Sequence, residues 1–261
     1  MLNSLWIAKT GLDAQQAAMD VTANNLANAN TTGYKSSRVS FQDLMYQNKG
    51  QAGAQTTEQT QSPTGNMYGT GVRVVGTEKA FTEGSITQTS NQLDVAIQGR
   101  GFLQVSMPDG TTAYTRDGSL HTDQNGQLVT ADGYPITPAI TVPQNVQSLT
   151  IGSDGTVSAV TAASPNGQTI GTLQLADFIN PPGLQPSGQN LYLETASSGN
   201  PQTSQPSLNG MGSLLQGSLE SSNVNVVSEM VNMIQTQRTY EMNSKAVSAT
   251  DQMLQDLTEK M

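Results

Sequence analysis

The chain has 261 residues, of which 12% are charged and 5% aromatic, and its formal net charge at pH 7 is −9. Because it carries no cluster of Lys and Arg, this balance argues against nucleic acid or an anionic membrane surface as a partner. Uncharged polar surface costs less to desolvate than charged surface, so the composition suits a protein that buries much of its surface against neighbours, although a β-rich secreted protein would use similar residues.

Residues 3 to 28 predict a first helix. Four apolar residues recur every seven positions and keep one seam on one side of the helix: Leu5, Leu12, Met19 and Leu26. Asparagines follow at its end, and then Gly33, which can take the left-handed conformation that terminates a helix. The asparagines either fray the helix end or act as buried amides that fix the register of packed helices.

Residues 46 to 71 lose this periodicity, and their Gly, Gln, Thr and Ser content is typical of a flexible linker. The alternative is a segment that a neighbouring subunit holds in place.

From residue 72 to about residue 219 the pattern indicates β structure. Short apolar or alternating runs predict strands at Val72–Val75, Leu93–Ile97, Phe102–Val105, Leu149–Ile151 and Leu173–Ala176. Turn dipeptides separate the runs: Asp109-Gly110, Asp117-Gly118, Asn125-Gly126, Asp132-Gly133, Asp154-Gly155 and Asn166-Gly167. The first four are spaced as successive tight hairpins would be. We therefore expect a compact antiparallel β domain.

Residues 224 to 257 predict a long second helix with the same seven-residue period. Its apolar column contains Val226, Met233, Tyr240, Val247 and Leu254, and Met230 and Ile234 widen it. Two helices with one apolar seam each, at opposite ends of the chain, both need a partner. The simplest prediction is that they pair.

Catalytic and metal-binding patterns are absent from the sequence. His121 is the only histidine and cysteine is lacking, so neither a Cys/His metal set nor a His-containing triad can be assembled. Gly99-Arg100-Gly101 lacks the third glycine of a dinucleotide site, and Asp123–Gly126 fits a turn better than a calcium loop. No cofactor is expected. A carboxylate pair for glycoside cleavage stays open, which leaves a secreted enzyme acting on cell-wall polysaccharide as the alternative class.

Several stretches together resemble the axial (rod and hook) proteins of the bacterial flagellum. They include Ser4–Gln16, Leu93–Phe102, Tyr114–Gly118 and Ser222–Val226, with likeness along nearly the whole chain. The motif residues that carry the resemblance are Asn24, Asn25, Asn28, Thr32, Gly33, Tyr34, Lys35, Gln237, Arg238, Tyr240 and Glu241. One departure is Leu103, where the family commonly has a second Phe.

The resemblance implies an α+β fold in which the terminal helices pair as a coiled-coil-like domain. The expected parts are a helical polymerisation core (1–34 plus 224–261), an extended connecting region (35–75 plus 208–223) and an outward-facing, mainly antiparallel β domain (76–207). The inner helix seam is expected to drive assembly.

The implied function is that of a structural subunit in the distal part of the rod, a hollow helical driveshaft that transmits torque and passes exported subunits. A place in the proximal rod is the alternative. The implied partners are other copies of the chain, the proximal rod proteins, the hook protein, the P-ring and L-ring proteins and the flagellar type III export apparatus.

The expected location is the basal body, from the periplasm to the outer membrane. The first ten residues lack the pattern of a cleaved signal peptide, and no apolar run has the length of a transmembrane helix, so export without a cleaved signal is expected. The absence of cysteine fits a reducing compartment as well as a protein that must avoid stray disulfides in an oxidising one.

Overall fold

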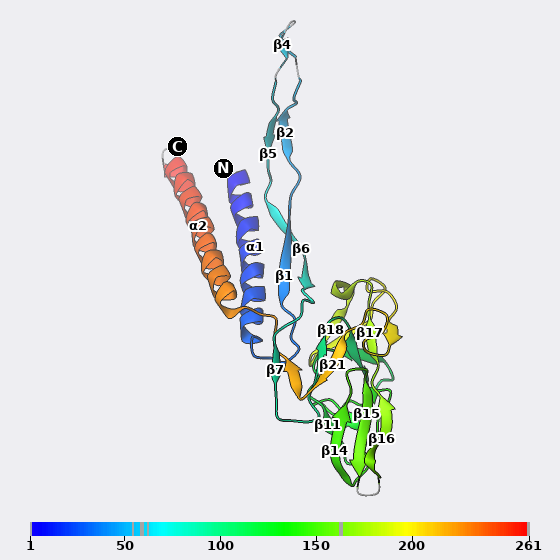
Figure 1. Cartoon of the computed structure of the whole chain (residues 1–261). Coiled ribbons are helices and arrows are strands. Elements are labelled where there is room, and N and C mark those ends of the chain that lie inside the picture. The colour runs from blue at the N-terminus through cyan, green and yellow to red at the C-terminus, as the bar shows by residue number, and fades with distance from the viewer. Residues whose placement is uncertain (1, 54, 58–59, 62, 162–163, 260–261) are drawn as a thin grey trace. The chain divides into compact units, whose positions relative to one another are not determined.

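The computed structural model describes residues 2–53, 55–57, 60–61, 63–161 and 164–259. The chain divides into two compact units. Unit 1 consists of residues 1–26, 37–78 and 226–261, and unit 2 of residues 27–36 and 79–225. Unit 1 holds two long helices and a β-ribbon, and unit 2 is a β domain (Figure 1). The α+β class predicted from the sequence is confirmed.

The two long helices are α1 (Leu2–Ala27) and α2 (Val226–Glu259). Both lie where the seven-residue columns predicted them, and Glu229 in the first turn of α2 suits the positive end of the helix dipole. Gly33 takes the left-handed conformation expected of it (φ +65°), although it lies six residues beyond the end of the helix. α1 ends at Ala27, and a turn follows in which the amide of Thr31 donates to the carbonyl of Asn28 (3.2 Å), because Asn and Thr compete with helical hydrogen bonds.

The β-ribbon of unit 1 consists of three successive strand pairs. β1 (Ser37–Asp43) pairs with β6 (Val72–Lys79), β2 (Gln47–Gly50) with β5 (Asn66–Tyr68), and β3 (Gln55–Thr57) with β4 (Thr60–Gln61). The flexible linker predicted for residues 46–71 is therefore wrong for the residues described there; residues 54, 58–59 and 62 lie outside them. Backbone ladder bonds form without an apolar pattern, and Tyr and Thr favour strands.

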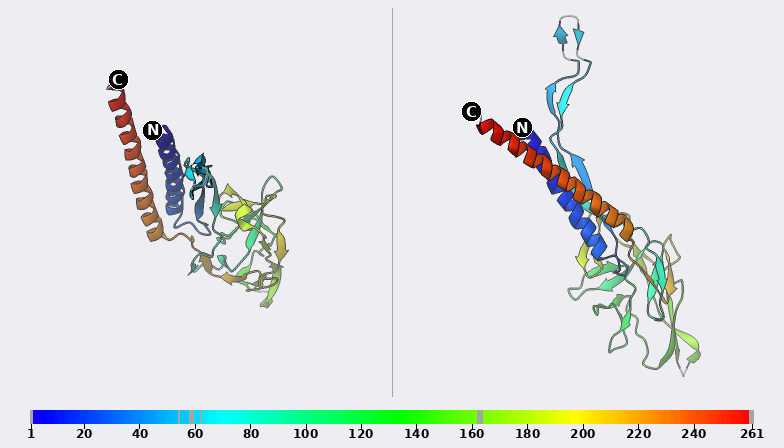
Figure 2. Two further views of the ribbon diagram at one scale, coloured as in Figure 1. Left: turned by 90° about the horizontal axis from the view of Figure 1, so that it is seen from above. Right: turned by 90° about the vertical axis from the view of Figure 1, so that its left-hand side faces the viewer.

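Within unit 1, α1 lies between α2 and the ribbon, as two views agree (Figures 1 and 2). Gly71 at the start of β6 sits against α1 so closely that a Cβ there would lie 2.2 Å from the Thr10 hydroxyl oxygen. On the other side, a Cβ at Gly11 would lie 3.0 Å from the Asn243 amide nitrogen of α2. Glycines at both positions allow this close approach.

The main sheet of unit 2 has the order β18-β19-β10-β9-β17-β20, with β13 also pairing with β9. Its strands are β9 (Phe102–Ser106), β10 (Thr112–Thr115), β13 (Ile136–Thr137), β17 (Leu175–Asp177), β18 (Gln185–Gly188), β19 (Leu191–Leu193) and β20 (Gln202–Ser204). A second sheet joins β14 (Val146–Ile151), β15 (Thr156–Thr161) and β16 (Ser164–Thr172). Smaller pairs join β7 (Ile86–Gln88) to β22 (Ser218–Glu220), β8 (Val95–Gln98) to β21 (Ser213–Gln216), and β11 (His121–Thr122) to β12 (Leu128–Val129). A short 3-10 helix, η1, spans Pro181–Gly183.

All five predicted strand runs lie at least partly in strands, and most turn dipeptides lie in turns. Gly110, Gly126 and Gly155 have positive φ between antiparallel strands, and Gly133 has positive φ in a turn. Two dipeptides were predicted wrongly. Asp117-Gly118 lies in extended chain, where the Gly118 carbonyl accepts from the Val95 amide (3.0 Å), and Asn166-Gly167 lies inside β16 at a register shift.

Two apolar layers cover opposite faces of β9, because successive side chains of a strand alternate. Leu103 belongs to a large aliphatic cluster, and Phe102 belongs to an aromatic cluster with Tyr114, Phe178 and Tyr192. Unit 1 differs sharply: among its described residues, Ala14 is the only buried apolar residue. A hydrophobic core therefore exists in unit 2, while the helices and the ribbon of unit 1 lack one.

Candidate functional site

The outer face of α2 carries an unpaired apolar stripe at its N-terminal half. Val227, Met230, Val231 and Ile234 are all exposed, Val227 to 72% and Ile234 to 48%. Their spacing of i, i+3, i+4 and i+7 places them on one side of the helix, which is the pattern of a packed helix face. We call these four residues the α2 stripe. An exposed apolar stripe of this kind marks an interaction surface.

The seven-residue column of the first helix is covered within the subunit. Leu5, Leu12, Met19 and Leu26 are all partly buried. Asn25 is buried beside Leu26, and Ala14 is buried midway along the helix. α1 therefore uses its apolar side for contacts inside unit 1, where α2 and the ribbon flank it (Figure 2).

The predicted column of the second helix is covered only in part. Met233 and Val247 are partly buried, whereas Val226, Met230, Ile234 and Tyr240 are exposed; the side chain of Leu254 lies outside the described residues. A polar column lies among the less exposed positions of α2, also with a seven-residue period: Glu229, Thr236, Asn243 and Thr250. Much of the predicted apolar seam thus remains open in the single subunit.

A groove of about 500 Å³ lies between the helices and the start of β6. Ser4, Ala8 and Gly11 of α1 and Asn243 and Ala246 of α2 line it, together with Ile7, Gly71 and Val72. Most of these side chains are small, so the groove could accept an apolar side chain from outside the subunit. It is a second surface of unit 1 suited to contact with a neighbour.

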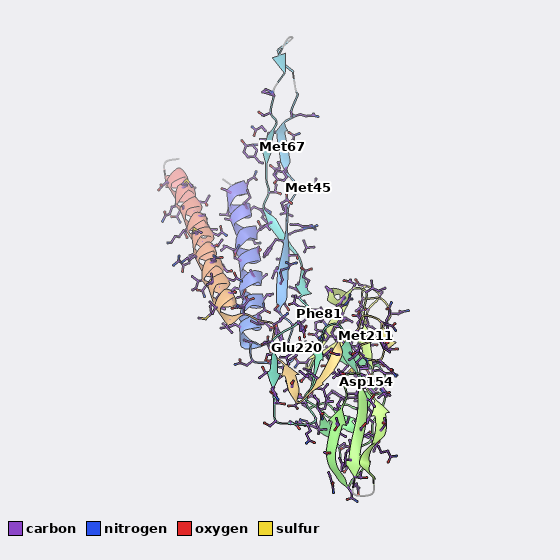
Figure 3. The ribbon with its side chains drawn as sticks, in the orientation of Figure 1. Met45, Met67, Phe81, Asp154, Met211 and Glu220 are labelled. Atoms are coloured by element: carbon purple, nitrogen blue, oxygen red, sulfur yellow. The ribbon has the colours of Figure 1, made fainter. Side chains whose placement is uncertain are left out.

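The ribbon presents a third apolar surface. Its exposed large side chains are Phe41, Met45, Tyr46, Met67 and Tyr68. Figure 3 labels Met45 and Met67 on this ribbon, and Asn48 of β2 is the cross-strand partner of Met67. The ammonium of Lys49 lies 5.2 Å from the ring centroid of Tyr68. Because a two-stranded ribbon has no second layer, these side chains need an external partner to be buried.

The asparagine motif has a definite structural role at one position. Asn25 is buried; its amide nitrogen donates to the Ser37 carbonyl (2.8 Å), and its amide oxygen accepts from the Ser37 backbone amide (2.8 Å). The same nitrogen also donates to the Glu229 carboxylate (3.4 Å), which connects α1 to α2. Asn25 therefore fixes the start of the ribbon against the helix; the role of the asparagines in fixing the register of packed helices stays a prediction. Asn24 is exposed, and Asn28 accepts from the Thr31 hydroxyl in the turn (3.2 Å).

The second part of the motif lies in unit 2 and forms a buried charge cluster that the sequence did not predict. The ammonium of Lys35 lies 2.5 Å from Oε1 of Glu220, and Nη1 of Arg116 lies 3.3 Å from Oε2 of the same carboxylate. The side chains of Lys35 and Glu220 are fully buried. The Gly84 amide (2.9 Å) also donates to Glu220, and Lys35 also donates to the Thr82 carbonyl (2.8 Å).

Burial decides the electrostatics of this cluster. Desolvation lowers the pKa of Lys35 below its ordinary value, although the Glu220 carboxylate opposes the shift. Arg116 donates from Nη2 to the Gly99 carbonyl (2.7 Å), while its Nε is buried without a partner among the described residues. Two cations share one carboxylate, so Glu220 is the group on which the cluster depends.

Gly33 and Asn223 add further contacts around the charge cluster. Residues 33–36 and 220–223, which are far apart in the sequence, are hydrogen-bonded to each other here, and we call this region the junction. The Gly33 amide donates to the Glu220 carbonyl (2.8 Å), and the Ser36 amide donates to the Asn223 side-chain oxygen (2.7 Å). Gly33 has a φ of +65°, and a Cβ there would lie 2.8 Å from the backbone of Arg116 and Asp117. Only glycine fits this position without strain. Tyr34 is buried beside it, with the Lys79 ammonium 4.6 Å from its ring centroid, and Asn190 donates to the Thr32 carbonyl (3.1 Å).

The motif residues of α2 are placed differently. Gln237, Arg238, Tyr240 and Glu241 are all exposed on the helix. They are not brought together with Lys35 into one site. They lie on the open surface of α2, where their side chains are accessible to another molecule.

Three groups important for the junction were missed as functional residues: Arg116, Glu220 and Asn223. Arg116 and Asn223 lay inside stretches quoted for the resemblance, but nothing local indicated burial. Glu220 is the last residue of β22, where buried and partly buried side chains alternate, but the sequence carries no local signal that a carboxylate there is buried. The cluster joins residues up to 185 positions apart, a proximity that periodicity cannot reveal.

Sites of other kinds were sought in the described part of the chain. No group of three or more His, Cys, Asp or Glu side chains gathers there in a metal-binding arrangement. His121 is exposed on β11, and the Gly126 amide donates to the Asp123 carbonyl (2.8 Å) in an ordinary turn. Neither described helix combines the length and apolar character needed to cross a membrane.

Three family models match the chain along its length. Residues 5–35 match "Flagella basal body rod protein", residues 96–159 match "Flagellar hook protein FlgE/F/G D1 domain", and residues 215–260 match "Flagellar basal body rod FlgEFG protein C-terminal". The first and third cover the helices, the asparagine motif and Glu220, and the second covers Arg116.

Curated relatives match the chain over nearly its full length. Flagellar basal-body rod protein FlgG of Buchnera aphidicola subsp. Schizaphis graminum is 54% identical, covering 99% of this chain and 100% of the relative. Those of Borreliella burgdorferi and Bacillus subtilis are 46% and 40% identical, with 97% and 98% of each chain covered. The chain therefore belongs to the FlgG family of flagellar basal-body rod proteins and is a structural subunit of the rod.

Proposed function

We propose that the chain forms the distal part of the rod, where its copies polymerise into a hollow helical driveshaft. This shaft transmits motor torque to the hook and passes exported subunits through its channel. In this proposal the terminal helices pair in a coiled-coil-like manner and form the inner layer, and the β domain faces outward. The helical core comprises residues 1–34 and 224–261, the connecting region 35–75 and 208–223, and the β domain 76–207.

One observation carries this proposal: unit 1 has helices and a ribbon but almost no buried apolar side chains. Helices in water gain most of their stability from packing an amphipathic face. The α2 stripe, the groove between the helices and the apolar side chains of the ribbon are three surfaces that this packing could use. A neighbouring copy in a polymer supplies the missing contacts. The enzyme alternative gains no comparable support from any site in the described residues.

The proposed position in the distal rod implies further partners. The shaft contacts the proximal rod proteins on one side and the hook protein on the other, and the P-ring and L-ring proteins surround it. The flagellar type III export apparatus delivers the subunits. The location is the basal body between periplasm and outer membrane. The exposed motif residues Gln237, Arg238, Tyr240 and Glu241 are assigned to contacts between subunits.

The test compares polymerisation of the wild-type chain with that of the Ile234→Ser variant by sedimentation and electron microscopy. Fully burying an Ile contributes about 1.5–3 kcal/mol, and about half of Ile234 is still exposed, so its burial in the polymer contributes about 0.7–1.5 kcal/mol. The critical concentration of the variant should rise about 3- to 12-fold.

Ile179→Ser is the matched control, because Ile179 is 78% exposed but belongs to unit 2 and not to a helix of unit 1. It should leave the critical concentration unchanged. If Ile234→Ser polymerises as the wild type does, the α2 stripe is not an assembly surface and the proposal loses its main support.

A further inference from the structure

A pocket of about 540 Å³ with polar and apolar walls lies in unit 2, beside Tyr114 of the aromatic cluster. Gln104 of β9 and Tyr114 of β10 line its floor; these residues are directly opposite each other in the strand register. Asp109 from the turn between the two strands and Glu194, which follows β19, also line it. The pocket belongs to none of the assembly surfaces described above.

Two buried polar side chains reach this pocket without a partner. Tyr114 is 2% exposed and Gln104 is 7% exposed. Among the described residues, neither the Tyr114 hydroxyl nor the Gln104 side-chain amide takes part in a hydrogen bond. The rest of both side chains is buried, whereas the hydroxyl and the amide are open to the pocket and are not among the sealed polar atoms. A ligand in the pocket would therefore meet an unused hydroxyl and an unused amide, the kind of precisely placed polar groups that orient a bound molecule.

The charge of the pocket selects the kind of ligand. Hydrogen bonds from the Thr111 hydroxyl (2.6 Å) and the Thr111 amide (3.0 Å) lower the pKa of Asp109, which keeps this carboxylate charged. Burial, together with the nearby Glu194 carboxylate, raises the pKa of Tyr114 to about 12. The Tyr114 hydroxyl thus stays protonated and lies near Glu194. No Lys or Arg lines the pocket, so its two carboxylates favour a cation.

The walls specify the shape of that cation. Leu193 and Pro201 add an apolar surface beside the carboxylates. The ring of Tyr114 packs edge to face against Phe178 in the core, with ring centroids 4.8 Å apart, so its face is not available to a ligand. The absence of an open aromatic face in the pocket lining disfavours a sugar, which usually stacks on such a face. A charged head on an aliphatic stem fits better, because such stems pack along apolar surface.

We propose that this pocket binds the guanidinium or ammonium group of an arginine or lysine side chain from a partner protein. The carboxylates of Asp109 and Glu194 accept hydrogen bonds from the charged head, as do the Gln104 oxygen and the Tyr114 hydroxyl oxygen. Leu193 and Pro201 contact the stem. The β domain thereby gains a specific docking point for a basic residue, separate from the helices that build the shaft.

The probes are Nα-acetyl-arginine methylamide and Nα-acetyl-lysine methylamide, titrated against the full chain and followed by saturation-transfer difference NMR of the probe. The citrulline analogue, which has the shape of arginine without its charge, is the control probe. We expect saturable binding of the two cationic probes and at least tenfold weaker binding of the citrulline analogue. Equal binding of citrulline, or no saturable signal up to the solubility of the probes, would overturn the proposal. So would binding of N-acetylglucosamine in place of the cations.

Variants locate the binding. Glu194 is exposed, so the Glu194→Gln variant should fold normally and bind the arginine probe with about tenfold lower affinity. Asp109→Asn should lower the affinity for this probe severalfold. Asp154→Asn is the matched control, since Asp154 (Figure 3) also precedes a glycine and accepts from the amide (3.0 Å) and hydroxyl (2.8 Å) of Thr156, yet lies outside the pocket. An equal loss in the Asp154 variant would show that the effect comes from total charge and would refute the assignment.

Discussion

Replacing Glu220 by Gln isolates the contribution of the buried charge cluster. The change keeps the shape of the side chain and removes the single negative charge that Lys35 and Arg116 share. Removing one partner of a buried ion pair costs about 3–5 kcal/mol, because the remaining charge stays buried without compensation. Two cations lose their partner here, so we expect the upper end of that range.

Lys35→Met provides the comparison. It removes one cation and leaves the Glu220 carboxylate with Arg116 and the Gly84 amide. The expected cost is about 1.5–3 kcal/mol, that of losing one hydrogen bond to a charged group. The double variant should cost less than the sum of the two single variants by about 1–3 kcal/mol, because Glu220→Gln leaves the buried Lys35 ammonium without its carboxylate and Lys35→Met removes that ammonium.

Urea unfolding of the full chain, followed by near-ultraviolet circular dichroism, measures these values. The signal comes mainly from unit 2, whose aromatic cluster contains Phe102, Tyr114, Phe178 and Tyr192. Thermal unfolding should give a Tm for Glu220→Gln that is about 6–20 °C lower. If Glu220→Gln costs under about 1 kcal/mol, or costs less than Lys35→Met, the reasoning is refuted.

Three further predictions concern single positions. The pKa of Lys35 is lower in the folded state than its ordinary value of 10.5, so at a pH between the folded-state pKa and 10.5 the unfolded state binds more protons. The stability advantage of the wild type over Lys35→Met should therefore grow as pH rises toward 10.5. A difference in the free energy of unfolding that stays constant with pH in urea titrations would contradict this. Gly33→Ala should destabilise unit 2 by more than the about 1–2 kcal/mol of a positive φ alone, whereas Gly110→Ala, with a φ of +83° and open space around it, should cost only that amount in the same unfolding assay. Asn25→Ala should cost about 2–4 kcal/mol and increase hydrogen exchange at residues 37–39, because two backbone groups lose their partner; a cost under about 1 kcal/mol with unchanged exchange would contradict the role of Asn25.

Periodicity predicted the elements whose pattern is local. Leu5, Leu12, Met19 and Leu26 predicted α1, and the alternation around Phe102 predicted β9, whose two faces carry different clusters. Turn chemistry placed Gly110, Gly126 and Gly155 correctly between strands. It failed at Gly118, where the backbone of Val95 approaches from a distant part of the sequence.

The rest depends on contacts that no local pattern records. Lys35 and Glu220 are 185 positions apart and look like ordinary surface charges in the sequence. Residues 46–71 have a linker composition, yet those that the structure describes contribute to the ribbon through backbone pairing. In α2, the polar column of Glu229, Thr236, Asn243 and Thr250 lies among the less exposed positions, so the apolar periodicity identified the helix without fixing which side is covered.

The most direct test of the proposed assembly is hydrogen exchange with mass spectrometry, on dilute monomer and on the assembled polymer. Unit 1 lacks a core of its own, so residues 2–26 and 226–259 should exchange rapidly in the monomer and become protected in the polymer. Residues 95–220, which contain the core of unit 2, should be protected equally in both states. If both helices are fully protected in the dilute monomer and do not change on assembly, the terminal helices are self-sufficient. The proposal that they complete their packing in the polymer would then be contradicted.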